Sequence, residues 1–501
     1  MTEFLTGLPY LPLLILATSL GIAPVIFVLD DAHARARTAL NLSAAAIKVA
    51  LVIWLSWQVA QGTEYSLQFE MLPGLDFALR TDPLAVLFMA LSATLWLLTT
   101  IYAVGYLEKG PHRSRFFGFF SICVGATVGI AMAGNLFTFL LFYELLTLAT
   151  YPLVVHRGSA AALKAGRLYL IYTLSGGLML LVGTLWLSVL AGSTEFVPRG
   201  IVVDLTDDHA GTLQIIFVLL IAGVGVKAAL VPLHAWLPIS MVAPAPVSAL
   251  LHAVAVVKAG AFGIMRVVYE IYGIDTAQAL GVTGPLAALA AVTIIYGSIR
   301  ALGQDDIKRR LAFSTVSQVS YITLGVALAS PVAAIGALAH LIHQGLMKIT
   351  MFMAAGNLAE ELHIKKVSQM NGVGRLMPGT MLAFSLAALG MIGVPPLAGF
   401  ISKWYLASGS LAENADWVIA VLLGSSLLNA AYFLPILHRA WFLPPSGTTD
   451  SRLPTRPKIG WMMAGPPLGT AALVLVAGVL ANAPFSPLEW TRFIVSREYT
   501  E

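Results

Sequence analysis

The stretch that decides the fold is GVGVKAALVPLHAWLPISMVAPAPVSALLHAVAVVKAG, residues 223–260. It is apolar over most of its length, yet it contains two lysines, two histidines and four prolines. A charged side chain at the centre of a bilayer costs about 2.5–3.5 kcal/mol on insertion scales, and proline removes backbone donors that lipid cannot replace. A helix that is broken inside the protein and lines a polar cavity resolves both problems, and such helices are typical of transporters. The alternative is a kinked helix whose lysines extend to the surface, but the sequence on both sides of Lys227 is apolar. The titratable residues of the stretch are Lys227, His234, His252 and Lys258.

The composition of the whole chain is that of a membrane protein. Of its 501 residues, 58% are hydrophobic and 11% are charged, and the mean hydropathy is +0.84. Because a soluble domain carries roughly 25% charged residues, we predict an all-α polytopic membrane protein. The single cysteine, Cys123, excludes protein-ligated iron–sulfur clusters and a disulfide framework. Residues 1–29 lack a basic leader, so we expect them to form a retained first span.

Apolar runs of about 20 residues indicate helices that can cross the hydrocarbon. Basic loops follow the odd-numbered runs and acidic loops follow the even-numbered ones. By the positive-inside rule, this alternation predicts that both termini lie outside, and one helix more or fewer would break it. Fourteen runs occur, and they begin near residues 8, 38, 83, 116, 135, 166, 213, 246, 282, 309, 332, 378, 415 and 462.

Few ionisable residues lie well inside these spans. Glu144, in NLFTFLLFYELLTLATYPLVV, is the only carboxylate deep in the predicted membrane region, and we expect it to pair with a buried lysine. The alternative is a protonated glutamate that packs as a polar core residue. Lys48 lies close enough to the inner end of the second span to reach the surface or to have a function. Arg266, near the end of the eighth span, is expected to reach the surface.

The eleventh span, LAHLIHQGLMKITMFMAAG, contains His340, His343 and Lys348. The two histidines are three residues apart and share a helix face, and Lys348 follows two turns after His340. The three side chains can therefore border one cavity. A zinc site is a poor interpretation, because no carboxylate or cysteine completes a ligand set.

The twelfth span, LAALGMIGVPPLAGFISKWYL, is interrupted in the same way as the seventh. Pro395 and Pro396 cannot both lie in a regular helix interior, and Lys403 follows them. Aligning VPLHAWL (231–237) with PPLAGFI (395–401) sets prolines of the two segments opposite each other at an offset of five spans. Two broken helices in corresponding places indicate two five-helix repeats, spans 4–8 and 9–13, of opposite topology.

The repeats divide the chain into four predicted parts. Residues 1–115 form three N-terminal helices, residues 116–275 the first repeat, residues 276–440 the second repeat, and residues 441–501 a loop and the last helix.

Five motifs now resemble one family. They are FYELLTLATYPLV around Glu144, the stretch 223–260, DDIKRRLAFSTVSQVSY (305–321), HLIHQGLMKITMFMAAG and GVPPLAGFISKW. They are similar to the antiporter-like membrane subunits shared by respiratory complex I and Mrp-type multisubunit cation/proton antiporters, over roughly residues 80–440. The resemblance implies fourteen helices, two inverted repeats and a proton path along the membrane plane. It implies these roles: Glu144 and Lys227 as a coupling pair, Lys258 and His252 as a central relay, His340 and Lys348 as a second relay, and Lys403 as the terminal group, with His234 and His343 as further relay candidates.

Within this family the chain most resembles the D-type subunit of Mrp antiporters. The HQGLMK pattern, with His343 shifted from its commoner placement, favours that type. The complex I subunit of comparable length usually has glutamate where Lys403 stands, and the one with a long lateral helix extends further than the roughly 18 residues that follow the fourteenth span here. The alternative is a proton-pumping subunit of NADH:quinone oxidoreductase or of a related hydrogenase complex.

The sequence therefore predicts a proton-translocating subunit of a monovalent cation/proton antiporter in the bacterial cell membrane. We expect other membrane subunits and the bilayer as partners, protons with Na⁺ or K⁺ as transported ions, and no cofactor, metal, nucleic acid or redox site of its own. The rival classes are a redox protein that binds quinone, a stand-alone anion carrier and a structural scaffold. Four central lysines cost on the order of 10 kcal/mol in total, which argues against a scaffold.

Overall fold

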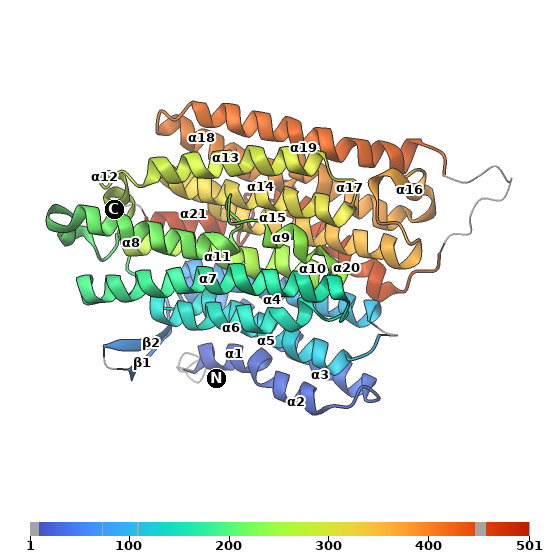
Figure 1. Cartoon of the computed structure of the whole chain (residues 1–501), viewed down its shortest axis with the longest axis horizontal. Coiled ribbons are helices and arrows are strands. Elements are labelled where there is room, and N and C mark those ends of the chain that lie inside the picture. Colours follow the sequence, from blue (N-terminus) through green and yellow to red (C-terminus); the bar gives the residue numbers. More distant parts are fainter. Residues whose placement is uncertain (1–9, 73, 108–109, 446–456, 500–501) are drawn as a thin grey trace.

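The computed structural model describes residues 10–72, 74–107, 110–445 and 457–499. Most of its helices lie side by side with their axes along the long direction of the molecule (Figure 1). The N-terminal half comprises α1 (Leu11–Leu20), α2 (Ile22–Val28), α3 (Ala34–Ala60), β1 (Ser66–Leu72), β2 (Leu75–Arg80), α4 (Pro83–Tyr106), α5 (Arg113–Met132), α6 (Leu136–Val154), α7 (Ala160–Ala191), η1 (Val203–Leu205), α8 (Thr206–Lys227), α9 (Trp236–Ile239), η2 (Ser240–Val242), α10 (Ala245–Ala249), η3 (Leu250–Val254), α11 (Val256–Arg266) and η4 (Val267–Tyr272).

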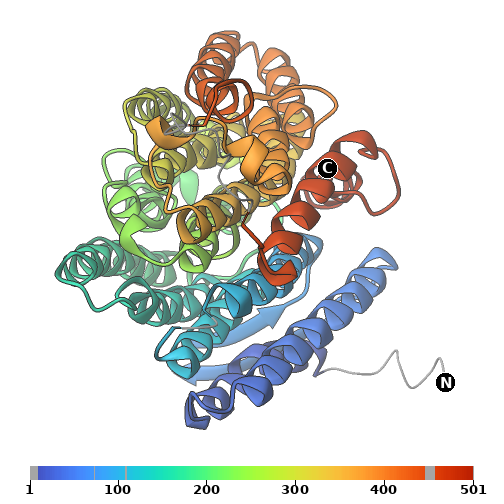
Figure 2. The same ribbon diagram turned by 90° about the vertical axis from the view of Figure 1, so that its right-hand side faces the viewer.

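The C-terminal half continues the bundle. Both views place α8–α11, drawn in green, between the blue N-terminal helices and the orange helices α17–α19 (Figures 1 and 2). Its elements are α12 (Ile274–Ala279), α13 (Thr283–Leu302), α14 (Ile307–Ala327), α15 (Pro331–Glu361), η5 (Val367–Gln369), α16 (Val373–Leu376), α17 (Pro378–Ile392), α18 (Ala398–Ala412), α19 (Trp417–Phe442), α20 (Trp461–Val479) and α21 (Pro487–Glu498).

The predicted membrane fold is confirmed. Within the described residues, twelve helical segments are long and apolar enough to cross a membrane. The two remaining predicted spans coincide with α14 and with the broken pair α17–α18. A total of fourteen spans is consistent with this arrangement and stays a prediction.

Both predicted helix breaks are present. Helix α8 ends at Lys227, and regular helix resumes at Trp236. Helix α17 ends at Ile392, where Gly393 takes a left-handed conformation with φ of 98°, a common way to end a helix. Helix α18 then begins at Ala398. Both breaks contain a cis X–Pro bond, Val231–Pro232 in one and Pro395–Pro396 in the other.

The eighth predicted span forms the centre of the bundle. Its most apolar window is entirely buried, and two π-helical turns, η3 and η4, interrupt its regular helix. Turns of this kind occur frequently at functional sites. The first contains His252 and the second contains Glu270, while Lys258 lies in the regular helix between them.

The acidic loop after the second span forms a small antiparallel hairpin, β1–β2, in place of the expected loop. It is followed by Asp82, which approaches the end of α11. There Arg266 is fully buried, with Nη1 2.9 Å from Asp82 Oδ2 and 2.6 Å from Glu270 Oε1. The expectation that Arg266 reaches the surface was therefore wrong, because the fold supplies two carboxylates beside it. Glu270, in the second π-helical turn, is only 1% exposed.

Asp82 has a second cation beside it. Arg80 Nε donates to Asp82 Oδ2 at 3.1 Å, and Arg80 Nη2 lies 3.6 Å from Glu270 Oε2. Burial opposes ionisation of Asp82, but the charges of Arg266 and Arg80 outweigh it and hold the pKa of the Asp82 carboxyl below its ordinary value. Two arginines thus contact two carboxylates where the hairpin meets the bundle, and the charges of all four act on Glu498 of α21.

Candidate functional site

The four lysines singled out in the sequence lie on four different helices, α8, α11, α15 and α18. Three are fully buried and Lys403 is half-buried. Each donates to a backbone carbonyl of another helix, and none takes part in an ion pair with any residue that the structure describes. The acceptors are Tyr143 for Lys227, Leu341 for Lys258, Leu311 for Lys348, and both Met391 and Ile392 for Lys403.

Lys227 is the last residue of α8, directly at the first break. Its amino group donates to the carbonyl of Tyr143 and lies 3.2 Å from the centre of the Tyr143 ring. The expected pairing with Glu144 is not a direct ion pair. Glu144 Oε1 is buried and has no hydrogen-bond partner among the described residues, although its charge and that of Lys227 still act on each other. The coupling of these two residues stays a prediction, and it would act through space or through water.

The Glu144 carboxyl occupies space that is open only because Gly177 of α7 has no side chain. A Cβ added to Gly177 would lie 2.0 Å from Glu144 Oε1. We therefore expect Gly177→Ala to displace this carboxyl and reduce proton flux about tenfold, without loss of the folded chain. Gly183→Ala, whose Cβ would lie 2.9 Å from the flexible end of Leu220, is the control on the same helix. Proton flux is measured in vesicles for both variants. Equal flux in Gly177→Ala and Gly183→Ala would contradict the role of Gly177 in placing the Glu144 carboxyl.

The first break and the central helix are in direct contact. A Cβ on Gly260 of α11 would lie 2.2 Å from the backbone nitrogen of Ala228 and 2.7 Å from the carbonyl carbon of Lys227. Glycine is required here because the two backbones approach so closely. Lys258, two residues earlier, donates to the Leu341 carbonyl at 2.7 Å. The helix that carries Lys258 therefore packs against the first break, and the Lys258 side chain binds the long helix α15.

The charge of Lys258 acts on several groups of α15. It acts on His340, His343 and Lys348, and the carbonyl that Lys258 binds, that of Leu341, lies between the two histidines in the chain. The role of Lys258 as the central relay stays a prediction. Both ring nitrogens of His343 are buried without a hydrogen-bond partner in the described part of the chain. Buried polar atoms are normally hydrogen-bonded to protein or to ordered water, and such atoms mark places where water can enter.

His252 has a similar environment in the π-helical turn η3. Its ring stacks on Phe352 at 4.4 Å between centres, and neither ring nitrogen has a protein partner among the described residues. The charge of Lys348 acts on it. The structure therefore places His252 beside the row of lysines, between α11 and α15.

The second half of the row ends at the second break. His340 Nδ1 and Ser402 Oγ are 2.8 Å apart, and the charge of Lys403 acts on His340. Lys403 donates to Met391 O at 3.0 Å and Ile392 O at 2.8 Å, the last two carbonyls of α17. Carbonyls at a helix C-terminus lack helical partners and carry partial negative charge. The second break itself therefore binds the terminal lysine.

Lys348 is held between α15 and α14. It donates to Leu311 O at 3.2 Å and to Ser314 Oγ at 2.7 Å. Tyr432 of α19 donates to the same serine at 2.8 Å. A hydroxyl that contacts both an amine and a phenol can pass a proton between them, because it both donates and accepts.

His234 does not join this row. Its ring contacts Tyr296 at 5.0 Å and Phe313 at 6.3 Å between centres, and the charge that acts on it is that of Arg300. It lies in the broken segment after α8, turned toward α13 and α14. Its relay role stays a prediction, and no described contact supports it.

Sequence reasoning missed three neutral polar residues that lie near this row. Gln318, Tyr321 and Gln344 are fully buried. The Gln344 amide has no hydrogen-bond partner among the described residues, and the Tyr321 hydroxyl lies near Gln318, Ser425 and Ser426. The Tyr321 ring stacks on His340 at 5.2 Å between centres and lies 5.4 Å from the Lys403 amino group. A search for neutral polar residues inside apolar spans would have found them.

Comparison with known proteins decides the family. Residues 133–429, more than half of the chain, match the family described as "NADH:quinone oxidoreductase/Mrp antiporter, TM", and residues 73–117 match "NADH-Ubiquinone oxidoreductase (complex I), chain 5 N-terminus". The chain belongs to the NADH:quinone oxidoreductase/Mrp antiporter family. The resemblance found in the sequence is thereby confirmed.

Relatives within this family have different names. NADH-quinone oxidoreductase subunit N of Desulforudis audaxviator is 36% identical over 408 residues, 79% of each chain. The D-type subunit of the Na(+)/H(+) antiporter of Bacillus subtilis is 30% identical over 365 residues, 72% of this chain and 73% of that one. A probable K(+)/H(+) antiporter protein of the A/B type from Rhizobium meliloti is 32% identical over 88% of this chain, which spans only 44% of it.

The fold of this family member is also found in a solved assembly. A chain of the Mrp complex from Dietzia sp. DQ12-45-1b superposes with a TM-score of 0.85 over 98% of this chain and 97% of that one, at 22% sequence identity. At this identity the likeness establishes the fold alone.

Proposed function

We propose that the chain is the proton-translocating membrane subunit of a multisubunit monovalent cation/proton antiporter, similar to the D-type subunit of Mrp antiporters. The observation that carries the proposal is the row of buried amino and imidazole groups that runs from one broken helix to the other. The relatives named as components of Na(+)/H(+) and K(+)/H(+) antiporters support the cation/proton assignment.

The row can move protons because its lysines form no ion pair within the described part of the chain. Burial disfavours the charged form of a lysine, and a nearby carboxylate favours it. Each amino group here donates hydrogen bonds to neutral carbonyls or hydroxyls, so the charge on its neighbours determines whether it holds a proton. A change at Glu144 would alter the proton occupancy of Lys227, and the change would pass through Lys258 to α15. The buried polar atoms without protein partners provide places for water between these groups.

The assembly follows from the same proposal. The partners are other membrane subunits of the same complex, and the location is the bacterial cell membrane with both termini outside. The parts 1–115, 116–275, 276–440 and 441–501 are proposed as its N-terminal helices, two repeats and C-terminal element. The chain itself would carry no redox chemistry.

A second candidate is a proton-pumping subunit of a redox-driven complex. The observation that favours it is the relative named NADH-quinone oxidoreductase subunit N, which is 36% identical over 79% of both chains. The same row of lysines could translocate protons in an antiporter or in a redox-driven complex. The two candidates differ in the energy source that drives proton movement.

Lys403→Ala tests the proposal. In vesicles from cells that carry the full gene cluster, with no NADH or other reductant, we expect proton flux driven by a Na⁺ or K⁺ gradient, and we expect the variant to lower it about a hundredfold. Lys458→Ala, which changes an exposed lysine, is the control. Flux that arises only when a reductant is oxidised would favour the redox-driven candidate. Flux that Lys403→Ala leaves unchanged would refute the role of the row.

A further inference from the structure

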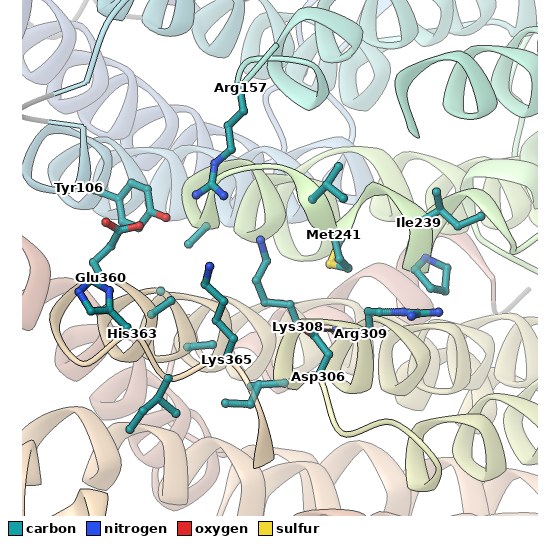
Figure 3. A pocket seen from close by; sticks show the side chains of 18 residues that line it. Tyr106, Arg157, Ile239, Met241, Asp306, Lys308, Arg309, Glu360, His363 and Lys365 are labelled. Atoms are coloured by element: carbon teal, nitrogen blue, oxygen red, sulfur yellow. Dashed lines mark hydrogen bonds between the residues drawn. The ribbon is translucent and has the colours of Figure 1, made fainter. Parts of the chain in front are cut away.

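A cavity opens at one end of the bundle, away from the row of lysines. Its volume is about 600 Å³, which is within the usual range for small-ligand sites. It lies where α4 and α15 end and α14 begins, because Tyr106, Glu360 and Lys308 all line it (Figure 3). The positions of these helix ends place the cavity at the level of a bilayer surface.

Three cationic side chains converge on this cavity from three different segments. Figure 3 shows the guanidinium of Arg157 and the amino groups of Lys308 and Lys365 pointing into the same space. Arg157 and Lys365 are exposed, whereas Lys308 is half-buried and donates to the Ala243 carbonyl at 2.5 Å. None of the three forms an ion pair with a described residue. The charges of Arg157 and Lys365 both oppose the charge on Lys308.

The acidic residues of the lining, Asp306 and Glu360, favour the charge on Lys308 but offset the cations only in part. Asp306 caps α14 by accepting from the backbone N–H of Arg309 at 2.8 Å, and Glu360 lies with Tyr106 on the other side of the cavity (Figure 3). The lining contains four Lys or Arg side chains and two carboxylates, a net charge of +2 with histidine neutral. An anion between the three converging cations would remove their mutual repulsion.

The other residues that line the cavity indicate which kind of anion it can bind. One wall is apolar and comes from the segment between the first break and the central helix and from the end of α15. Ile239 on this wall is 40% exposed. A free inorganic ion gains nothing from such a wall, whereas a lipid covers it with its glycerol and upper acyl carbons. The apolar residues of the lining are Pro238, Ile239, Met241, Val242, Ala245, Ile307, Ala355, Ala359 and Ile364.

We propose that this cavity binds the phosphate group of an anionic membrane phospholipid. Arg157 and Lys365 donate charge-assisted hydrogen bonds to the phosphate oxygens. The half-buried Lys308 adds a third positive charge deeper in the cavity, and the apolar wall contacts the lipid's glycerol and upper acyl carbons. The site does not depend on the transport function, because none of its residues belongs to the row of lysines.

The test uses the full chain in nanodiscs of phosphatidylcholine alone and of equal parts phosphatidylcholine and phosphatidylglycerol. Native mass spectrometry measures the lipid that stays bound. We expect the wild-type chain to retain phosphatidylglycerol in preference to phosphatidylcholine. Lys365→Gln is expected to weaken phosphatidylglycerol binding about tenfold, because it removes one charged hydrogen-bond donor. The double variant Arg157→Gln/Lys365→Gln removes two such donors and is expected to weaken binding further.

Arg309→Gln is the matched control. Arg309 lines the same cavity on the same helix as Lys308 but points away from the converging cations (Figure 3), so its loss should leave retention unchanged. Both changed residues of the double variant are exposed, and the single Lys365→Gln variant gives a second measurement that folding should not disturb. Equal retention by the double variant and the wild type would overturn the proposal. So would equal retention of the two lipids, or complete displacement of phosphatidylglycerol by inorganic phosphate, which would assign the site to the free ion.

Discussion

Lys258→Ala is expected to lower proton flux a hundredfold or more. Lys258 lies on the fully buried central helix and donates to the Leu341 carbonyl at 2.7 Å. Its charge acts on groups of α15 that lead to the second break. A positioned proton-transfer group typically contributes a factor of 10²–10⁴ to a rate. Without its amino group, the hydrogen bond between α11 and α15 at this point of the row is lost, and His252 is left as a titratable group between these two helices. Flux in vesicles that contain the intact complex, driven by a cation gradient or by a reductant, measures the loss.

Lys48→Ala provides the matched control for Lys258→Ala. Lys48 is equally buried, but it lies on α3, where it donates to Ser19 at 2.6 Å and faces the Trp96 ring at 4.8 Å. The same atoms are removed from the same kind of environment, outside the row. We expect this variant to retain flux within about twofold. Equal losses in both variants would mean that buried lysines matter for packing alone, and full flux in Lys258→Ala would contradict the relay.

The helix breaks could be predicted because their cause is local. Proline lacks a backbone N–H, so its position in an apolar span fixes a break whatever surrounds it. The segments 231–237 and 395–401 also matched each other, which placed the two breaks in corresponding parts of the chain. The buried lysines could be predicted for the same reason, since they lie far from both ends of long apolar runs.

Other features depend on contacts that no local pattern records. Arg266 and Asp82 are 184 residues apart in sequence, so the sequence around Arg266 gave no sign of its partner. The direct partner of Lys227 is a backbone carbonyl, and carbonyls occur at every position. The hairpin β1–β2 is different, because its first strand does carry a local signal: apolar Leu67, Phe69 and Met71 alternate with polar residues, a pattern typical of a strand. Helix α14 was predicted despite its polar residues because the charge pattern of the loops required a span there.

Arg266→Met is expected to lower the free energy of unfolding by about 3–5 kcal/mol, the cost of breaking a buried ion pair by removal of one partner. Arg266 is fully buried and binds Asp82 Oδ1 at 3.0 Å and Glu270 Oε1 at 2.6 Å. The methionine fills much of the arginine's volume, so the loss reports charge and not a cavity. Unfolding of the purified chain in a mild detergent, followed by its thermal midpoint, measures the change.

The double variant Arg266→Met/Glu270→Gln separates this electrostatic effect from general damage. It removes one cation and one anion, and the remaining pair, Arg80 and Asp82, is still in contact at 3.1 Å. Because the charges balance again, we expect the double variant to be more stable than Arg266→Met alone, although it carries one substitution more. Arg492→Ala, which breaks a partly exposed pair with Glu489, should cost less than about 1 kcal/mol. A double variant less stable than Arg266→Met would show that Arg266 stabilises the fold through packing and not through its charge.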